Sequence, residues 1–121
     1  MGDSGNNLIR QIVISTGVVT TVAGTGSSGS ANGTGTSASF NLPRGITTDG
    51  TNLYVAEYGN HLIRKIVIST GVVTTVAGTG STGSANGTGT SASFNYPIGI
   101  TTDGKDLYVA DWNNHLIRKI E

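Results

Sequence analysis

Short runs of β-forming residues, separated by turn residues, follow one another along the chain. Between residues 43 and 77 these runs are residues 45–48, 53–56, 61–68 and 72–77, with Asp-Gly, Gly-Asn and Thr-Gly pairs between them. Such pairs favour tight turns. The last two runs are apolar on both faces, as expected of strands packed between two neighbouring sheets. The pattern predicts an antiparallel meander of four strands, which is typical of a β-propeller blade.

The same pattern recurs with a spacing of 54 residues. A Leu-Ile-Arg run begins residues 8–61, begins residues 62–115, and begins the partial third copy at residues 116–121. Nine of the 54 aligned positions differ between the two full copies, so 45 are identical. Copies this similar must adopt the same local structure, and they are typical of recent duplication or of an engineered fragment. Residues 1–121 are therefore predicted to be one all-β propeller fragment with two blades.

A tract of 17 residues, 24–40, joins the fourth strand of one copy to the first strand of the next. Gly, Ser, Thr and Asn dominate this tract, and they favour turns over helices. Residues 36–40 are expected to form one helical turn, with Phe40 as an anchor between two blades. A loop of this length is uncommon unless it is functional or packed down. We expect it to cross from the rim of one blade to the axis of the next.

Composition argues against several classes of function. Seven Lys and Arg balance seven Asp and Glu, and 12% of residues are charged, so we expect no nucleic acid partner and no membrane association. The chain has no cysteine, which excludes a disulfide or a Cys-based zinc site. Residues 24–29 match G-x-G-x-x-G, but the Gly- and Asn-rich residues that follow cannot begin a helix well. We therefore expect no nucleotide and no other cofactor.

Ordered motifs occur twice, in residues 43–66 and 97–120. Each segment has a Pro-x-Gly-Ile start, an Asp-Gly turn, a Leu-Tyr-Val-Ala strand followed by a carboxylate, and an Asn-x-x-Ile-Arg-Lys-Ile strand. In this order they resemble the NHL repeat, in a long-loop bacterial form whose Gly/Ser/Thr tract ends in Ser-Ala-Ser-Phe-Asn. The resemblance implies a propeller, commonly of six blades, that binds protein, RNA or small ligands. A minority of the family are lyases or hydrolases, and nothing in this chain matches their metal-binding residues.

Two blades are too few to close a ring, because each blade buries both faces against its neighbours. An isolated pair leaves two apolar faces in water, and burial contributes roughly 25 cal/mol per Å² of apolar surface. Head-to-tail association of identical chains is the expected solution. Three chains supply six blades and four chains supply eight. We expect a homotrimer first and a homotetramer second.

The third-strand sequence occurs three times in the chain, while the other strands occur twice. A ring of four-stranded blades needs only two copies per chain, so one terminal copy is surplus. We expect the last three strands of one chain to join residues 18–23 of the next. The C-terminal copy is expected to stay, because a complete second strand forms a hairpin with it. Residues 1–12 are then displaced.

Differences between the two copies indicate a candidate binding face. In a propeller the fourth-to-first and second-to-third connections lie on one face, and five of the nine differences, at positions 42, 44, 57, 58 and 59, map near that face. Aromatic rings with a nearby arginine are typical of binding surfaces, and neutral drift in variable loops is the alternative explanation. The candidate residues for binding a protein or a small ligand are Arg44, Glu57, Tyr58, Tyr96, Asp111 and Trp112.

An enzymatic alternative stays open, namely a fragment of a metal-dependent propeller lyase or hydrolase with its metal on the central axis. The first strands offer only Asp49 and Asp103 there, so we expect no catalytic residue and no metal site. His61 and His115 each follow a carboxylate by four residues across a turn, and we expect them on the rim. An RNA-binding platform is a third possibility, against which the zero net charge argues.

Two arginines, Arg64 and Arg118, lie in the middle of apolar strands. An unpaired charge at such a position is costly, so each is expected to pair with a carboxylate. Asp49 and Asp103 are the expected partners.

Overall fold

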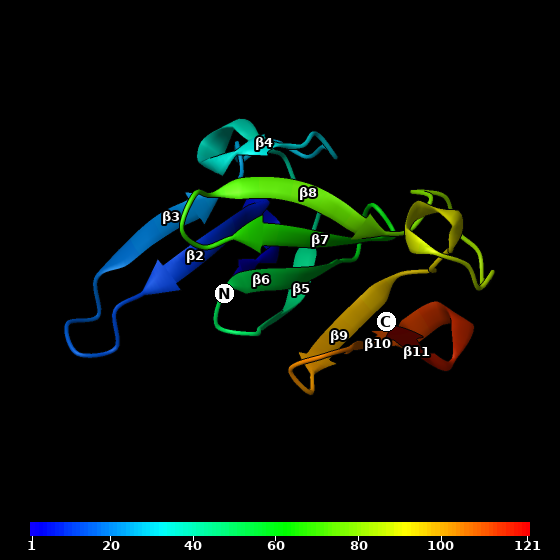
Figure 1. Cartoon of the computed structure of the whole chain (residues 1–121). Coiled ribbons are helices and arrows are strands. Elements are labelled where there is room, and N and C mark those ends of the chain that lie inside the picture. The colour runs from blue at the N-terminus through cyan, green and yellow to red at the C-terminus, as the bar shows by residue number, and fades with distance from the viewer.

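The computed structural model describes all 121 residues as three antiparallel sheets that pack side by side (Figure 1). The first sheet has the order β1 (Gly2–Asp3), β2 (Leu8–Ile12), β3 (Val19–Ala23). The central sheet has the order β4 (Gly33–Thr34), β8 (Val72–Ala77), β7 (Leu62–Val67), β6 (Asn52–Glu57), β5 (Pro43–Thr48). The third sheet has the order β11 (Leu116–Ile120), β10 (Leu107–Asp111), β9 (Pro97–Thr102).

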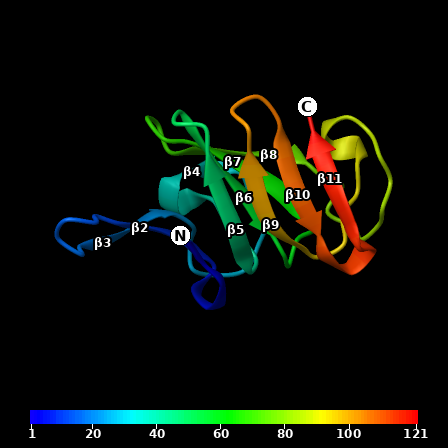
Figure 2. The same ribbon diagram turned by 90° about the horizontal axis from the view of Figure 1, so that it is seen from below.

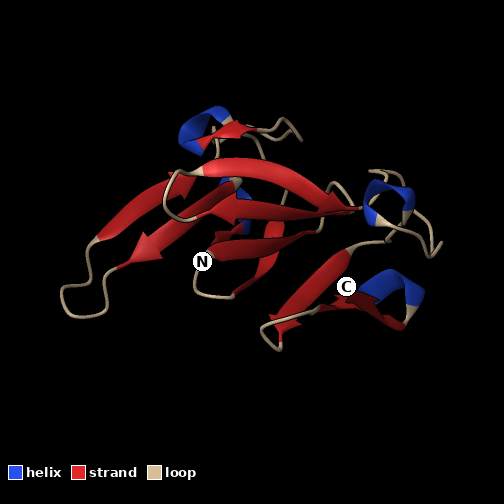
Figure 3. Cartoon of the chain, viewed as in Figure 1, coloured by secondary structure: helices blue, strands red, loops and turns tan.

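Single turns of 3-10 helix are the only helical structure, and Figure 3 shows them as small coils among the strands. They are η1 (Ser4–Asn6), η2 (Gly35–Ser37), η3 (Gly89–Ser91) and η4 (Trp112–Asn114). No helix in the chain is long and apolar enough to cross a membrane. The chain is all-β, as its sequence predicts.

The central sheet is the one complete blade. Strands β5, β6, β7 and β8 pair in order as an antiparallel meander. The four expected runs match these strands to within two residues at every end. A register shift between Ile63 and Arg64 bends the β7–β8 ladder, and such bulges increase the local twist. The short strand β4, which the sequence does not predict, pairs with the outer edge of β8 through Gly33 and Val73.

The first and third sheets are complementary parts of a blade. The third sheet holds first, second and third strands, and nothing pairs with the outer edge of β11. The first sheet holds a third strand, β2, and a fourth strand, β3, preceded by the two-residue β1. Within the single chain β2 pairs with β3 and β1 pairs with β2, whereas we expect residues 1–12 to be displaced in a ring.

The loop of residues 24–40, called the interblade loop from here on, leads from β3 to β5 past the outer edge of β8. Its helical turn is at Gly35–Ser37, one residue earlier than expected, and does not reach residue 40. Ala38 is extended, and Phe40 forms an isolated bridge with Ser28, so the end of the loop is β-like.

Two buried seams join the three sheets. Phe40 is fully buried in the first seam, where residues of the first and central sheets meet around it, so the expected anchor is confirmed. Phe94 holds the same position in the second seam, between the central and third sheets. The first seam contains Ile9, Ala23, Ala38, Phe40, Val55, Ile66 and Val73. The second contains Ala56, Ile63, Ala77, Ala92, Phe94, Leu107 and Val109.

The first strands of successive blades come close together, and Figure 2 shows β5 beside β9. A Cβ atom on Gly45 would collide with the Ile98 carbonyl oxygen and would lie 3.1 Å from the Gly99 Cα. The glycine of the Pro-x-Gly-Ile motif is therefore required by the approach of the next blade. At Gly99 the nearest atom to such a Cβ is the Ala110 Cβ at 3.6 Å, an ordinary contact.

Candidate functional site

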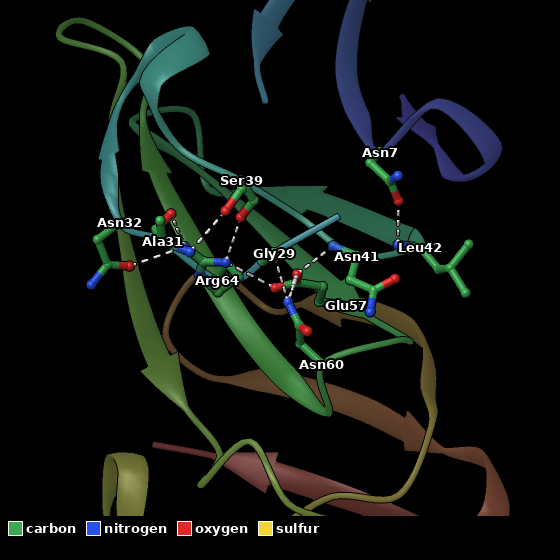
Figure 4. Close-up of polar contacts among 10 residues, drawn as sticks. All are labelled: Asn7, Gly29, Ala31, Asn32, Ser39, Asn41, Leu42, Glu57, Asn60 and Arg64. Atoms are coloured by element: carbon green, nitrogen blue, oxygen red, sulfur yellow. Dashed lines mark hydrogen bonds and ion pairs between the residues drawn. The ribbon is translucent and has the colours of Figure 1, made fainter. Parts of the chain in front are cut away.

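A buried arginine holds the interblade loop against the central sheet. The Nη1 of Arg64 donates hydrogen bonds to Glu57 Oε2 at 3.0 Å and to the Ser39 carbonyl oxygen at 3.1 Å. Its Nη2 donates to the Ala31 carbonyl oxygen at 3.1 Å and to Asn32 Oδ1 at 3.0 Å. Figure 4 shows these acceptors around the guanidinium. The planar, five-donor fork of arginine suits a set of oxygen acceptors on two chain segments.

The Glu57 carboxylate has donors of its own. It accepts hydrogen bonds from the Asn41 backbone N–H at 2.7 Å and from the side-chain amide of Asn60. That amide also donates to the Gly29 carbonyl oxygen at 2.7 Å. Burial raises the pKa of the Glu57 carboxyl from its ordinary value, while Arg64 and the hydrogen bonds oppose the rise. Removing either Arg64 or Glu57 would leave the other as an unpaired buried charge, which is costly. Because both side chains also hydrogen-bond to residues of the interblade loop or to Asn41 just after it, the pair holds the loop against the ends of β6 and β7.

The arrangement recurs in the other two sheets. Arg118 donates to Asp111 Oδ2 at 2.8 Å and to the Ser93 carbonyl oxygen at 2.9 Å. Arg10 pairs with Asp3 at 3.1 Å, but its guanidinium donates to no loop oxygen, and the two side chains are partly exposed. The network is therefore complete in the central and third sheets and incomplete in the first.

Both mid-strand arginines pair with a carboxylate, as expected, but the expected partners Asp49 and Asp103 are wrong. Arg64 lies opposite Val55 in the β6–β7 register. Glu57 is two residues further along β6, and side chains two residues apart share a face of the sheet. The turn aspartates follow the first strands, at the opposite end of the second strands from these carboxylates.

Asp49 and Asp103 serve the turns that follow the first strands. Asp49 Oδ1 accepts the backbone N–H groups of Thr51 at 2.9 Å and Asn52 at 2.7 Å, and its Oδ2 accepts the Tyr54 hydroxyl at 3.1 Å. Backbone hydrogen bonds lower the pKa of both aspartates from its ordinary value. No group of three or more His, Cys, Asp or Glu side chains is placed to hold a metal ion.

Four of the six candidate binding residues lie together, and we call them the aromatic face. The Arg44 guanidinium carbon is 4.3 Å from the centre of the Tyr58 ring. The Tyr58 ring centre is 4.6 Å from that of Tyr96 and 6.2 Å from that of Trp112. Arg44 and Tyr58 belong to residues 8–61, and Tyr96 and Trp112 belong to residues 62–115, where they flank strands of the third sheet, so the face crosses the second seam. Trp112 is 53% exposed and is available to solvent.

The remaining two candidates, Glu57 and Asp111, do not join the aromatic face. Both are fully buried, and both carboxylates are occupied by an arginine and by hydrogen bonds to asparagine groups. They hold the seam rather than face solvent.

His61 fastens the seam beside the aromatic face, although we expect it on the rim. It ends the turn after β6 with a positive φ of 58°, and its Nδ1 accepts the Tyr96 backbone N–H at 3.0 Å. This bond requires a neutral ring, and burial lowers the pKa of His61, with the charge of Asp111 opposing. In the first seam Asn7 Oδ1 accepts the Leu42 backbone N–H at 3.0 Å in the same way (Figure 4).

The sequence pattern of one known family matches the residues that form this site in the third sheet. The NHL repeat matches residues 94–120, which contain Phe94, the strands β9 to β11, and the Asp111–Arg118 pair. Residues 40–66, one repeat earlier, differ from them at only seven of those positions, which are among the nine described above. The chain is built of NHL repeats.

Several NHL-repeat proteins and propeller structures are similar to the chain. Human NHL repeat-containing protein 2 is 34% identical over 133 aligned residues, which cover 100% of this chain and 18% of that protein. The chicken protein of the same name is 33% identical over the same length. The chain thus spans about a fifth of the length of these relatives.

Two solved structures show the same fold over 98% of this chain. A Bacteroides thetaiotaomicron protein of unknown function has a TM-score of 0.91 and 30% identity, and the match covers 31% of it. An auxiliary nutrient binding protein from Bacteroides ovatus has a TM-score of 0.82 and 28% identity, and the match covers 33% of it. The chain therefore corresponds to about a third of each solved propeller-like protein.

Sequence reasoning missed most of the polar contacts made by the NHL repeat's long loop. Asn32 and Asn60 are identical in both copies, which was the first available signal. The seven-residue spacing from Glu57 to Arg64, repeated from Asp111 to Arg118, was the second signal. Neither signal states that the residues meet, because their contacts depend on the register of β6 and β7.

Proposed function

We propose that the chain is a non-enzymatic NHL-repeat binding module that closes a propeller ring by associating with copies of itself. The observation that carries this proposal is the contrast between two isoleucines in equivalent positions. Ile63 is 0% exposed because the third sheet covers it, whereas Ile117 is 75% exposed at the end of the chain. The surface that is buried between two blades is therefore presented to solvent at one end.

The opposite end of the chain is exposed in a complementary way. Val19 on β3 is 45% exposed, whereas its equivalent Val73 on β8 is 1% exposed. Their equivalents Ile63 and Val73 lie in different seams, so the two ends expose the two opposite faces of one blade, and a second copy carries the matching sequence for each. Association is then head-to-tail, and such contacts close into a ring when the rotation per chain permits.

Three copies are favoured over four. Each chain supplies one complete blade and the parts of a second, so three chains supply six blades, the number common in the resembling family. A tetramer with eight blades is the second choice.

A binding role is supported by the state of the carboxylates. Those of Glu57 and Asp111 are held in the seams, and those of Asp49 and Asp103 are held in turns. None of the four is left without a structural partner. A metal-dependent lyase or hydrolase needs such groups free to act, so the enzymatic alternative has less support.

Amide hydrogen exchange tests the self-association. The outer edge of β11 is unpaired in the single chain, while the equivalent edge of β7 is paired with β8. In a closed ring the peptide containing residues 116–120 is expected to exchange as slowly as that containing residues 62–66, and to lose this protection on dilution. Fast exchange of residues 116–120 at every concentration would contradict the proposal.

Ligand binding at the aromatic face is a second candidate function. It is favoured by the exposed Trp112, whose ring centre is 6.2 Å from that of Tyr58, and by Arg44 over the Tyr58 ring, since aromatic residues and arginine are enriched in binding hot spots. Trp112 is the only tryptophan, so its fluorescence reports on this face alone. Titration with a panel of sugars and peptides is expected to shift its emission for a ligand, and Arg44→Ala is expected to abolish the shift. An emission that no member of the panel changes would remove the support.

A further inference from the structure

The third sheet has a cleft where a fourth strand would lie. The cleft has a volume of about 450 Å³ and is lined in part by Phe94, Arg118 and Ile120. In the central sheet the counterparts of Phe94 and Ile120 are buried in one cluster with Val73 of β8. The cleft is therefore the space that the fourth strand fills in a complete blade.

The loop beside the cleft also lacks its partner. Gly87 and Thr88 have the same sequence as β4, which pairs with β8 in the central sheet. In the third sheet these two residues form no strand, because no fourth strand is present for them to pair with. One added strand would thus complete two sets of backbone hydrogen bonds, those of β11 and those of Gly87–Thr88.

The strand that fits is already present in the sequence. Residues 18–23, which include β3, are identical to β8, Val72–Ala77. β3 cannot reach the cleft of its own chain, because the first and third sheets lie at opposite ends of the molecule (Figure 2). A second copy is therefore the occupant that the cleft fits.

Within one chain β3 already has a partner, which is β2. Gln11 of β2 lies opposite Thr20 of β3, just as Lys65 lies opposite Thr74 in the complete blade. Because β2 and β11 are copies of the same third strand, they compete for one edge of β3. A blade that kept both would place two strands of the same direction side by side, which breaks the antiparallel meander.

The third sheet presents the better-supported competitor. β11 pairs along its whole length with the five-residue β10, while β2 has only the two-residue β1 on that side. Arg118 brings its loop acceptors with it, whereas Arg10 has Asp3 alone. Replacing β2 by β11 therefore completes a blade and releases a strand whose network is incomplete.

We infer that the ring closes by strand exchange, in which β11 of one copy displaces β2 of the next copy and pairs with its β3. Residues 1–12 of each chain are then released from the sheet. The inference rests on the self-association proposed above. In the exchanged register, Lys119 of one copy lies opposite Thr20 of its neighbour, as Lys65 lies opposite Thr74.

Paired cysteine variants test the exchange, since the chain has no cysteine of its own. In Thr20→Cys/Lys119→Cys, the two cysteines lie opposite each other on neighbouring strands only when β11 of one copy pairs with β3 of another. A disulfide can therefore form only between copies. In Gln11→Cys/Thr20→Cys, the matched control, the two cysteines lie opposite each other only within a copy that retains β2 beside β3. Gln11, Thr20 and Lys119 are exposed, so these changes leave both seams intact.

The oxidised proteins are compared by native mass and on a denaturing, non-reducing gel. Exchange predicts that Thr20→Cys/Lys119→Cys shifts from one chain to covalent trimers, while assembled Gln11→Cys/Thr20→Cys does not form its internal bond. A different result would overturn the exchange and leave self-association standing. In it, both variants form trimers, Gln11→Cys/Thr20→Cys forms its internal disulfide, and Thr20→Cys/Lys119→Cys forms no disulfide between copies. Monomers in both variants would overturn self-association itself.

A core substitution gives an independent readout. Ile9 is fully buried in the first seam of the single chain. If β2 is displaced, Ile9 stabilises only the unassembled chain, and Ile117 of the neighbour takes its place in the ring. Ile9→Asp is then expected to keep the trimer mass and to lower the concentration at which the trimer dissociates. A loss of assembly in Ile9→Asp equal to that in Ile117→Asp would overturn the exchange.

Discussion

The isoleucines in equivalent positions allow the buried and exposed ends of the chain to be compared directly. Ile63 is 0% exposed within the chain, and Ile117 is 75% exposed. Truncating a fully buried isoleucine to alanine costs about 2–5 kcal/mol, while truncating an exposed one usually changes stability by less than about 0.5 kcal/mol. Ile63→Ala is thus expected to lower the free energy of unfolding at every protein concentration, and Ile117→Ala only when the chain is assembled.

The effect of Ile117→Ala on a closed trimer follows from the number of seams. If each closing seam loses about 2 kcal/mol, three seams lose about 6 kcal/mol, or about 10⁴-fold in the trimer association constant. The concentration at half-assembly varies as the square root of that constant, so it is expected to rise about 100-fold. Sedimentation equilibrium over a range of concentrations measures this rise, and urea unfolding of the diluted protein measures stability.

Two results would refute this reasoning. An Ile117→Ala protein that dissociates at the wild-type concentration shows that Ile117 is not covered on assembly. A diluted Ile117→Ala protein that loses as much stability as Ile63→Ala shows that the side chain is already buried in the single chain.

Three further predictions concern the seams. Gly99→Ala is expected to leave the single chain folded but to prevent ring closure, measured as native mass. In the ring the first strand of the next copy would approach Gly99 as closely as β9 approaches Gly45 in the single chain. Assembly of this variant at the wild-type concentration would refute the idea. Glu57→Ala is expected to cost about 3–5 kcal/mol in urea unfolding, because the Arg64 charge loses its buried partner; a change below about 1 kcal/mol would show that the pair is solvated. Because burial lowers the pKa of His61, the unfolded chain binds a proton more readily, and the free energy of unfolding is expected to fall as the pH drops through about 6.5 towards the lowered value. His61→Asn keeps a hydrogen-bond acceptor and is expected to flatten this pH dependence, and an unchanged slope would assign it to another group.

Local signals were enough to predict the strands. The runs that became β5 to β8 are bounded by Gly-containing turns, and strand formation there needs only neighbouring residues. Phe40 was also predictable, because a lone aromatic ring in a polar tract has no local partner and must pack against another element.

Contacts that depend on register were not predictable from the sequence. Arg64 meets Glu57 rather than Asp49 because of the pairing of β6 with β7, which the turn residues do not specify fully. The two-residue strand β4 forms only because β8 offers a free edge, and the same residues form no strand beside β11. The candidate binding residues also divide into a group that the sequence places correctly and a group that it does not. Its aromatic members share a connection face, while its carboxylates point into the seams.

The native mass of the 121-residue chain tests ring closure most directly. Light scattering on a sizing column at micromolar concentration is expected to give one species of three times 12.3 kDa. A species of four times that mass would keep self-association and change the blade number to eight. A stable species of 12.3 kDa, unchanged on concentration, would show that the exposed faces of β3 and β11 need no partner, and the proposed ring would be wrong.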